Sequence, residues 1–241
     1  MNIAVIFAGG VGSRMNSKDR PKQFLEMYNK PIIIHTLEHF EKHNQIDAIV
    51  VVCISDWIPY FEELLYKYRI EKVKKVVSGG KTGQLSIYNG LKAAEEVAAE
   101  EKSIVLIHDG VRPLINEKLI SDNIEAVKKY GSSITSGIVK ETIVEIYDDY
   151  RIKIVPDRAH SRVAKAPQCF WLEDILNAHR KALEMGMEDF IDSCTMMKFF
   201  GKELYMTDGP YENIKITTPD DFYTMRAILE AKENAQIYGL E

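Results

Sequence analysis

Short runs of aliphatic and β-branched residues alternate along the chain with longer segments of helical periodicity. The first run, Ile3–Phe7, is apolar at every position, as expected of a parallel strand that is buried on both faces. This alternation predicts βαβ units with right-handed crossovers, and therefore an α/β fold with a mainly parallel, doubly wound central sheet. The other strands predicted in the first half are Ala48–Ile54, Val73–Val77 and Ile104–Ile107, and the predicted helices are Ile32–His43, Trp57–Tyr68 and Gln84–Ala99.

The second half of the chain departs from this alternation. Thr142–Tyr147 and Ile152–Val155 are predicted strands that a polar turn joins, with no helix between them to cover the hairpin. Because a hairpin alone cannot easily bury both faces, we expect an arm at about residues 140–158 that projects from one domain spanning residues 1–241, and a partner subunit that covers it. The remaining predicted elements are strands at Ile134–Val139, Leu204–Thr207 and Asn213–Ile216, and helices at Leu172–Met185, Ile191–Phe199 and Thr218–Ala235.

Composition excludes several classes of protein. With 31 Lys+Arg and 36 Asp+Glu, the formal charge of −5 argues against nucleic acid or an anionic membrane as the main partner. The longest uninterrupted apolar run, Ala48–Ile54, is far shorter than a membrane span, and no basic region precedes the first apolar stretch. Cys53, Cys169 and Cys194 form no CxxC pair, which argues against a disulfide framework or a cysteine metal site. We therefore expect a cytoplasmic protein.

The first predicted strand runs directly into a glycine-rich turn. Ala8 is followed by Gly9, Gly10 and Gly12, and Arg14 comes two positions later. Glycines at this point let backbone N–H groups approach a phosphate closely, at the edge of the sheet where α/β proteins bind ligands. The alternative is a tight turn that needs positive φ angles. The nearby arginine favours phosphate binding.

Two familiar phosphate motifs are absent. A dinucleotide fingerprint would require a glycine where Met15 stands, which disfavours an NAD-dependent oxidoreductase. A P-loop that ends at Gly80-Lys81-Thr82 would require a glycine where Lys75 stands. The glycine turn is instead followed by four cations within nine positions, a concentration that suits a triphosphate, although a solvated basic loop is the alternative. These cations are Arg14, Lys18, Arg20 and Lys22.

A third motif follows the predicted strand Ile104–Ile107. It reads His108-Asp109-Gly110-Val111-Arg112-Pro113. An acid at the carboxyl end of a strand can hold Mg²⁺, which needs only one or two carboxylates beside phosphate oxygens. Asp109 could equally begin a turn or cap a helix. His108 is expected to be a packed or hydrogen-bonded residue.

Taken together, these motifs resemble the sugar-alcohol-phosphate cytidylyltransferases, which include the methylerythritol-phosphate and ribitol-5-phosphate enzymes. The resemblance extends over nearly the whole chain and implies a Rossmann-like nucleotidyltransferase fold with a projecting β-hairpin arm. It also implies a homodimer joined by that arm, and a Mg²⁺-dependent reaction of CTP with a polyol phosphate. The matching segments are AGGVGSRM, PKQFL, HDGVRP, ETIVE, PDRAH, APQCF and NIKITTPDD.

The resemblance also implies a role for each matching residue, although any of the charged ones could instead form an ordinary surface ion pair. Asp109 would hold Mg²⁺, with Glu212 as a second metal ligand. The catalytic cations would be Arg14, Lys22 and Lys215. The nucleotide would be bound by Ala8, Gly9, Gly10, Gly12, Gly80, Ser86 and Asp109. The second substrate would be bound by Arg112, Thr142, Arg158 and Asp192.

Details within the motifs favour D-ribitol 5-phosphate as the second substrate, with CDP-ribitol and pyrophosphate as products for teichoic acid or capsule synthesis. The eight-residue step from Arg14 to Lys22 and the valine at Val111 are similar to the ribitol type. A methylerythritol 4-phosphate enzyme of isoprenoid synthesis is the alternative, and a non-catalytic nucleotide-binding subunit is a more remote one. The departures from the family pattern are Gly83 for arginine, and Ala166 and Ile191 for threonine.

Overall fold

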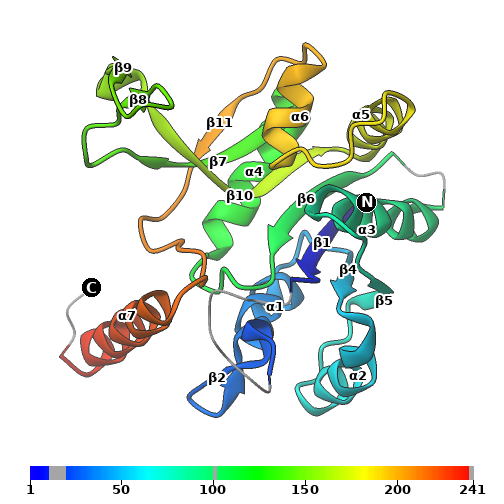
Figure 1. Ribbon diagram of the computed structural model, residues 1–241. Coiled ribbons are helices and arrows are strands. Elements are labelled where there is room, and N and C mark those ends of the chain that lie inside the picture. The colour runs from blue at the N-terminus through cyan, green and yellow to red at the C-terminus, as the bar shows by residue number, and fades with distance from the viewer. Residues whose placement is uncertain (11–19, 100–101, 239–241) are drawn as a thin grey trace.

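The computed structural model describes residues 1–10, 20–99 and 102–238 (Figure 1). Within these residues, seven strands form one central sheet in the order β11-β7-β10-β6-β1-β4-β5. In the first half, β1 pairs in parallel with β4 and β6, and β4 pairs in parallel with β5. The strands of this sheet are β1 (Asn2–Ala8), β4 (Ala48–Cys53), β5 (Val73–Ser78), β6 (Ile104–Asp109), β7 (Ser132–Ile138), β10 (Arg162–Trp171) and β11 (Met206–Asp208).

Helices cover both faces of this sheet. One apolar core lies between the sheet and α1, α2 and α4, and a second core lies between the opposite face and α3, α5 and α6. In the part of the chain that the structure describes, no helix combines the length and the apolar character that a membrane crossing requires. The helices are α1 (Ile32–Lys42), α2 (Ile58–Lys67), α3 (Gly83–Ala98), α4 (Glu117–Tyr130), α5 (Leu172–Glu184), α6 (Ser193–Phe199) and α7 (Pro219–Tyr238), with 3₁₀ turns η2 (Lys22–Phe24), η3 (Ser55–Trp57) and η4 (Arg158–His160).

The predicted α/β fold with a mainly parallel sheet is confirmed. Among the longer elements, helix α4 and strand β10 were not predicted, and β10 runs antiparallel to both β6 and β7. The ends of α4 do carry local signals, because the Asn116 side chain accepts a hydrogen bond from the N–H of Leu119 and Gly131 ends the helix with a φ of +85°. The prediction of a strand at Asn213–Ile216 was wrong, since this segment is irregular.

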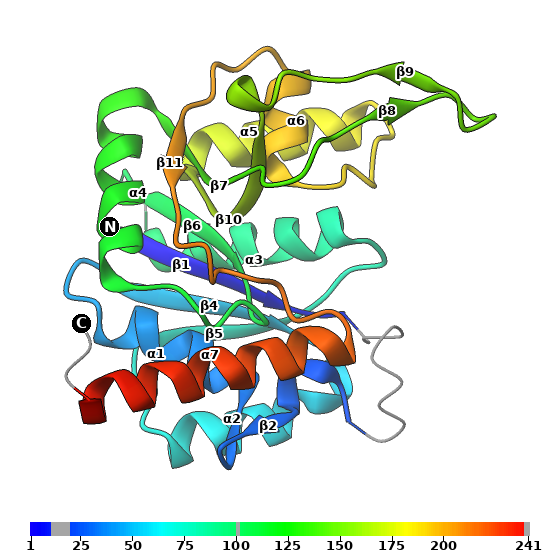
Figure 2. The ribbon, with the colours of Figure 1, turned by 90° about the vertical axis from the view of Figure 1, so that its left-hand side faces the viewer.

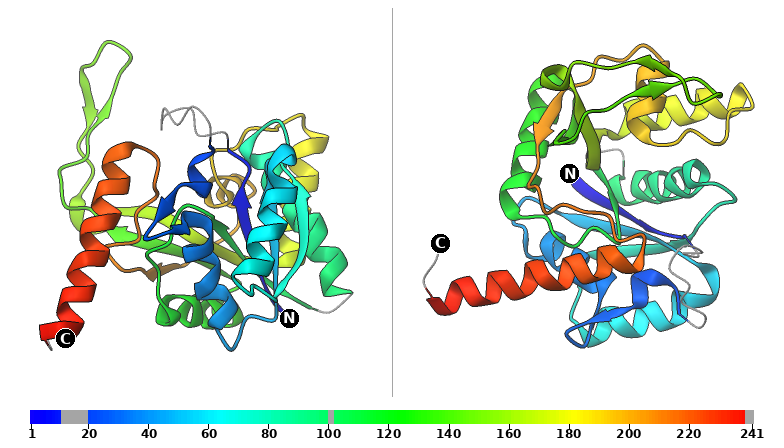
Figure 3. Two further views of the ribbon diagram at one scale, coloured as in Figure 1. Left: turned by 90° about the horizontal axis from the view of Figure 1, so that it is seen from below. Right: turned by 60° about the vertical axis from the view of Figure 1, so that its left-hand side comes forward.

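The predicted arm projects from the body of the molecule (Figures 2 and 3). It consists of two short antiparallel strands, β8 (Glu145–Ile146) and β9 (Ile152–Ile154), and β8 is shorter than the strand that was predicted. A second two-stranded antiparallel ribbon, separate from the arm, consists of β2 (Glu26–Met27) and β3 (Lys30–Pro31). The arm carries a set of apolar side chains that the described part of the chain leaves exposed. They are Ile143, Val144, Ile146, Ile152, Ile154 and Val155.

Helix α3 approaches the sheet closely at Gly90. A Cβ atom at this position would lie 2.7 Å from Cγ1 of Val5 and 2.7 Å from Cγ2 of Val52. Real Cβ atoms do not come this close to carbon, so the spacing of helix and sheet depends on the missing side chain. This contact sets the position of α3 and of the glycine loop before it.

We therefore expect Gly90→Ala to lower the free energy of unfolding by about 2 kcal/mol, because overpacking forces the helix away from the sheet. Gly83→Ala is the matched control, since a Cβ at Gly83 in the same helix meets no atom within 4 Å. This control should leave stability unchanged or raise it by up to about 1 kcal/mol. Urea denaturation measures both, and an equal loss in the two variants would contradict the close approach.

Candidate active site

Two glycine loops lie side by side at the carboxyl edge of the sheet. A Cβ on Gly9 would lie 3.7 Å from Cα of Gly79 and 3.7 Å from Oγ of Ser86. The Ser86 hydroxyl accepts a hydrogen bond from the N–H of Gly80 at 3.0 Å and donates to the Thr82 carbonyl at 2.9 Å. The structure thus brings together four of the predicted nucleotide-binding residues: Ala8, Gly9, Gly80 and Ser86.

Gly80 has no room for a side chain. A Cβ there would lie 2.6 Å from Cβ of Leu85, the third residue of α3. The loop can therefore fold over the start of α3 only with glycine at this position. Thr82 completes the turn, because its hydroxyl accepts a hydrogen bond from the N–H of Leu85 and so caps the helix.

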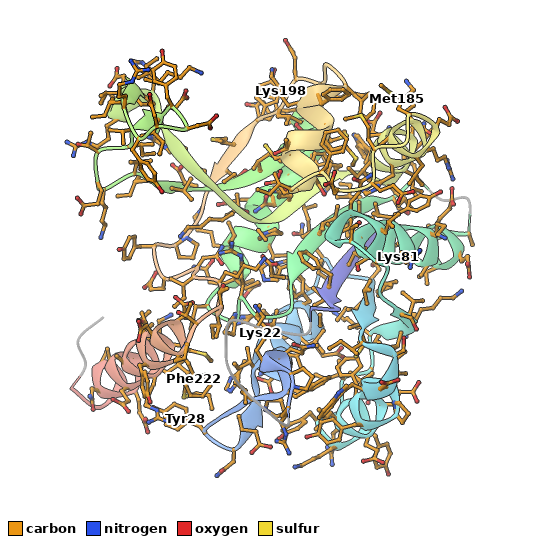
Figure 4. The ribbon with its side chains drawn as sticks, viewed as in Figure 1. Lys22, Tyr28, Lys81, Met185, Lys198 and Phe222 are labelled. Carbon is orange, nitrogen blue, oxygen red and sulfur yellow. The ribbon has the colours of Figure 1, made fainter. Side chains whose placement is uncertain are left out.

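Gln23 anchors the segment that carries Lys22. Its side-chain Nε2 donates to the Ala8 carbonyl at 2.6 Å, and the residue is buried. Next to it, Phe24 stacks on Trp57 with ring centroids 5.0 Å apart. These contacts hold Lys22 near the end of β1, where it lines a cavity together with Ala8. Figure 4 labels the position of Lys22. The sequence placed Gln23 in a motif but did not indicate this contact.

Asp109 is the last residue of β6 and lies between two cations. Its Oδ2 is 2.7 Å from Nε of Arg112, and its Oδ1 is 2.6 Å from Nζ of Lys215. Burial opposes ionisation of this carboxyl, but the charges of Lys215 and Arg112 outweigh that effect and leave its pKa below the ordinary value. Asp109 also begins a turn, in which its carbonyl accepts the N–H of Arg112, and it caps no helix.

The irregular segment 213–216 delivers Lys215 to this carboxylate. Arg112 Nη1 donates to the Asn213 carbonyl at 3.1 Å, and the N–H of Ile216 donates to the Val111 carbonyl at 2.9 Å. Buried Asn213 in turn donates from Nδ2 to the Ala166 carbonyl at 2.7 Å. The segment therefore binds the turn after β6 on one side and β10 on the other, which explains why it forms no strand.

Two neighbouring cavities share Asp109 and Lys215. The smaller has a volume of about 90 Å³, and Ala8, Gly10 and Lys22 are among its other lining residues. The larger is a cleft of about 350 Å³ whose polar lining residues include the predicted residues Asp109, Arg112, Asp192 and Lys215, together with Lys165 and Gln168. The first cavity thus adjoins the glycine turn, and the second lies beside β10 and the start of α6.

Asp192 faces the larger cleft with both carboxylate oxygens engaged. Its Oδ1 accepts the N–H of Thr195 at 2.7 Å and caps α6, which explains why this helix begins at Ser193 and not at Ile191 as predicted. Its Oδ2 accepts Nε2 of Gln168 at 3.0 Å. The side chain is therefore held in one orientation at the edge of the cleft.

The other predicted residues lie apart from this cluster or outside the described ranges. Thr142 and Arg158 are exposed in the arm region, where Arg158 Nη1 donates to the Lys140 carbonyl at 3.3 Å. Neither is among the described residues that line the chain's own cleft, and the same holds for Glu212. Gly12 and Arg14 lie outside the described residues.

His108 is a buried, packed residue, as the sequence indicated. It has no exposed surface, its ring contacts Phe40, and its Nε2 lies 3.1 Å from the Arg112 carbonyl. Burial lowers the pKa of His108 to about 4, so the imidazole is neutral near pH 7. It therefore supports the turn that carries Arg112.

Asp109 is a carboxylate of the type that Mg²⁺ prefers. Within the described ranges, no three His, Cys, Asp or Glu side chains are grouped so that they could hold a metal ion. A single carboxylate suits Mg²⁺ only when phosphate oxygens and water supply the other ligands. Both oxygens of Asp109 already contact cations, so a metal ion bound there would compete with Lys215 and Arg112 for this carboxylate.

Comparison with known proteins identifies the family. The model of the 2-C-methyl-D-erythritol 4-phosphate cytidylyltransferase (IspD) family matches residues 2–231. The chain belongs to this family. It is 56% identical over 240 residues to the ribitol-5-phosphate cytidylyltransferase of Streptococcus agalactiae serotype V, with 100% of both chains covered. It is 41% identical over 230 residues to the 2-C-methyl-D-erythritol 4-phosphate cytidylyltransferase of Clostridium novyi, with 95% of this chain and 96% of the relative covered.

A solved structure agrees with this assignment. The crystal structure of 4-diphosphocytidyl-2C-methyl-D-erythritol synthase from Anaerococcus prevotii matches with a TM-score of 0.82 and 30% identity, over 95% of this chain and 96% of that one. The fold and the motifs that the sequence indicated are therefore those of a cytidylyltransferase family. Within the family, identity is higher to the ribitol-5-phosphate relative than to the methylerythritol relative.

We expect Asp109→Asn to lower the free energy of unfolding by about 3 kcal/mol near pH 7, because Arg112 and Lys215 lose the charge between them. The control is Asp122→Asn on the exposed surface of α4, where the ion pair with Lys118 should contribute less than about 1 kcal/mol.

The same difference should depend on pH. Because the pKa of Asp109 is lowered in the folded state, its contribution is fully present above the ordinary aspartate pKa of about 4 and is lost as the pH falls through the lowered pKa. Urea denaturation at decreasing pH measures this. A difference between wild type and Asp109→Asn that stays constant down to low pH would contradict the ion-pair account.

Proposed function

We propose that this protein transfers the cytidylyl group of CTP to D-ribitol 5-phosphate and releases CDP-ribitol and pyrophosphate. The observation that carries the proposal is the Asp109–Lys215 pair at the junction of two cavities, one beside the glycine turn and one beside β10. The name of the Streptococcus agalactiae relative, at 56% identity over the full chain, supports ribitol 5-phosphate as the acceptor. Such a product suits a polymer of polyol phosphates, as in teichoic acid or capsule synthesis.

The chemistry requires charge neutralisation more than proton transfer. The acceptor is a phosphate monoester with a second pKa of about 6, so it is largely ionised near pH 7 and needs no general base. One of its oxygens forms a bond to the α-phosphorus of CTP while the bond to the bridging oxygen breaks and pyrophosphate leaves. Lys22 and Lys215, with Arg14, would offset the developing negative charge.

Mg²⁺ belongs to this proposal as a cofactor. Asp109 would hold it, and bound metal would neutralise charge on the phosphate oxygens. Lys215 would then exchange its contact with Oδ1 for a phosphate oxygen. Glu212 is a predicted second ligand. Its side chain is not among the described residues that line the larger cleft.

We also propose that the arm joins two copies of the chain. Its apolar side chains are exposed, including Ile152 at 62% and Ile154 at 50%. Thr142 and Arg158 lie at its base, outside the cleft of their own chain. An exchange of arms within a homodimer would cover the apolar surface and bring these two residues to the acceptor phosphate in the partner's cleft.

Two alternatives lead to different outcomes. Methylerythritol 4-phosphate is favoured by the family model and by the Clostridium novyi relative. A non-catalytic nucleotide-binding subunit is favoured by the departures at Gly83, Ala166 and Ile191, all of which line the larger cleft. The first would release pyrophosphate with a different acceptor, and the second would bind CTP without releasing pyrophosphate.

Pyrophosphate release by the purified protein with CTP and Mg²⁺ tests the proposal. We expect kcat/KM to be at least about tenfold higher with D-ribitol 5-phosphate than with methylerythritol 4-phosphate, because the two acceptors differ in length and in hydroxyl groups. Ribitol without phosphate is the control and should give no release. The opposite preference would support the isoprenoid alternative, and binding of CTP without release would support the non-catalytic one.

Sedimentation of the full chain tests the dimer. Wild type should sediment as a dimer, and Ile152→Asp should shift it to a monomer, because the substitution places a charge in the apolar contact. Tyr66→Asp is the control: Tyr66 is 89% exposed but lies on α2, away from the arm, and this variant should remain a dimer. A monomeric wild type would rule out the arm exchange.

A further inference from the structure

Strand β10 is irregular where it passes the larger cleft. Its pairing with β7 shifts in register between Ala164 and Gln168, so the three residues between them leave the regular ladder. Lys165 is the first of these three and lines the cleft. In a regular strand, successive side chains alternate between the two faces of the sheet. Because a bulge redirects side chains, Lys165 need not follow this alternation.

The space for the Lys165 side chain comes from a glycine in the neighbouring strand. A Cβ at Gly137 would lie 2.8 Å from Cε and 3.2 Å from Nζ of Lys165. The stem therefore lies against the bare backbone of β7, and Nζ donates to the Tyr211 carbonyl at 3.3 Å. The ammonium group is thus positioned by two strands and by the segment that leads to Lys215.

This ammonium group has fewer partners than it has donors. It carries three N–H groups, and the Tyr211 carbonyl is the one hydrogen-bond acceptor found for it among the described residues. None of the described carboxylates forms an ion pair with it. Burial and the nearby charge of Arg112 lower the pKa of Lys165, while Glu212 opposes them. A partly buried cation of this kind gains from an anion that reaches it.

The acids of the cleft are already engaged. Asp109 contacts Arg112 and Lys215, and Asp192 accepts hydrogen bonds from Gln168 and from the backbone of α6. Among its described lining residues, the larger cleft therefore has no carboxylate left to pair with Lys165. The smaller cavity, beside the glycine turn, does not include Lys165 among its lining residues.

We propose that Lys165 is a binding residue for the second substrate, and that its ammonium group donates hydrogen bonds to the phosphate oxygens of the polyol phosphate. The inference rests on the proposed function. It adds Lys165 as a residue that makes the site select an acceptor carrying a phosphate. The phosphate monoester is the strongest anion that this cleft would receive once the triphosphate occupies the side near Lys22. A neutral polyol, which has no phosphate, would gain much less binding from the charge of Lys165.

Steady-state kinetics with Lys165→Met tests this role. The substitution removes the charge and the donors and keeps a stem of similar length. We expect KM for D-ribitol 5-phosphate to rise at least about tenfold, while KM for CTP changes by less than about twofold. Lys165→Arg should recover part of the loss because it keeps the charge. Lys118→Met on the exposed face of α4 is the matched control and should change neither KM.

Gly137→Ala tests the position of the ammonium group without removing it. Its methyl group should displace Lys165 and raise KM for D-ribitol 5-phosphate, and the rise should disappear when Lys165→Met is already present. Urea denaturation of each variant verifies that it is folded. Equal effects of Gly137→Ala in both backgrounds would mean that the glycine acts through something other than Lys165.

The outcomes separate the inference from the proposed function. If wild type releases pyrophosphate with D-ribitol 5-phosphate and Lys165→Met keeps the same KM for it, the inference is wrong and the proposed function stands. If wild type releases none, the proposed function is wrong, and calorimetric titration with D-ribitol 5-phosphate and with methylerythritol 4-phosphate decides the inference. Weaker binding to Lys165→Met than to wild type then supports it, and equal or undetectable binding to both proteins overturns it.

Discussion

The contact of Asp109 with Arg112 and Lys215 holds together the parts of the molecule that form the site. Asp109 ends a fully buried strand, Arg112 lies in the turn that follows, and Lys215 comes from a segment about a hundred residues later. A buried carboxylate is stable only with such partners, so its charge requires the late segment to pass beside β6. The boundary between the two cavities follows from this one requirement.

Strand β10 extends this arrangement to the other side of the cleft. It runs antiparallel between β6 and β7, and its bulge leaves the Ala166 carbonyl to accept Nδ2 of Asn213. Gln168 in the same strand binds both the side chain of Asp192 and the backbone N–H of Cys194. One irregular strand therefore fixes the segment that carries Lys215 and the start of α6. It also begins next to the arm, which links the proposed subunit contact to the cleft.

The sequence predicted the first half of the fold because short continuous apolar runs such as Ala48–Ile54, alternating with segments of helical periodicity, are typical of parallel strands buried on both faces. It failed where partners distant in sequence decide the conformation. The alternation in Asn213–Ile216 is typical of a strand, but its backbone groups bind the turn after β6, and the segment remains irregular. The mixed composition of β10, with a proline inside it, gave no strand signal of its own. Motifs located Lys22, Asp109 and Lys215, and one of them contains Gln23. No local pattern indicates the contact of Gln23 with Ala8 or the position of Lys165, because both depend on segments distant in sequence.

By itself, the sequence determined the fold class and the projecting arm, because local periodicity and spacing encode these, and its motifs indicated the family. Only the tertiary structure decided which charges meet. Asp109 has its two cations because the chain folds back at 213–216, and Lys165 lines the cleft because a bulge in β10 lies against Gly137 of β7. Distances between segments far apart in sequence depend on the packing of the whole sheet, which no local pattern records.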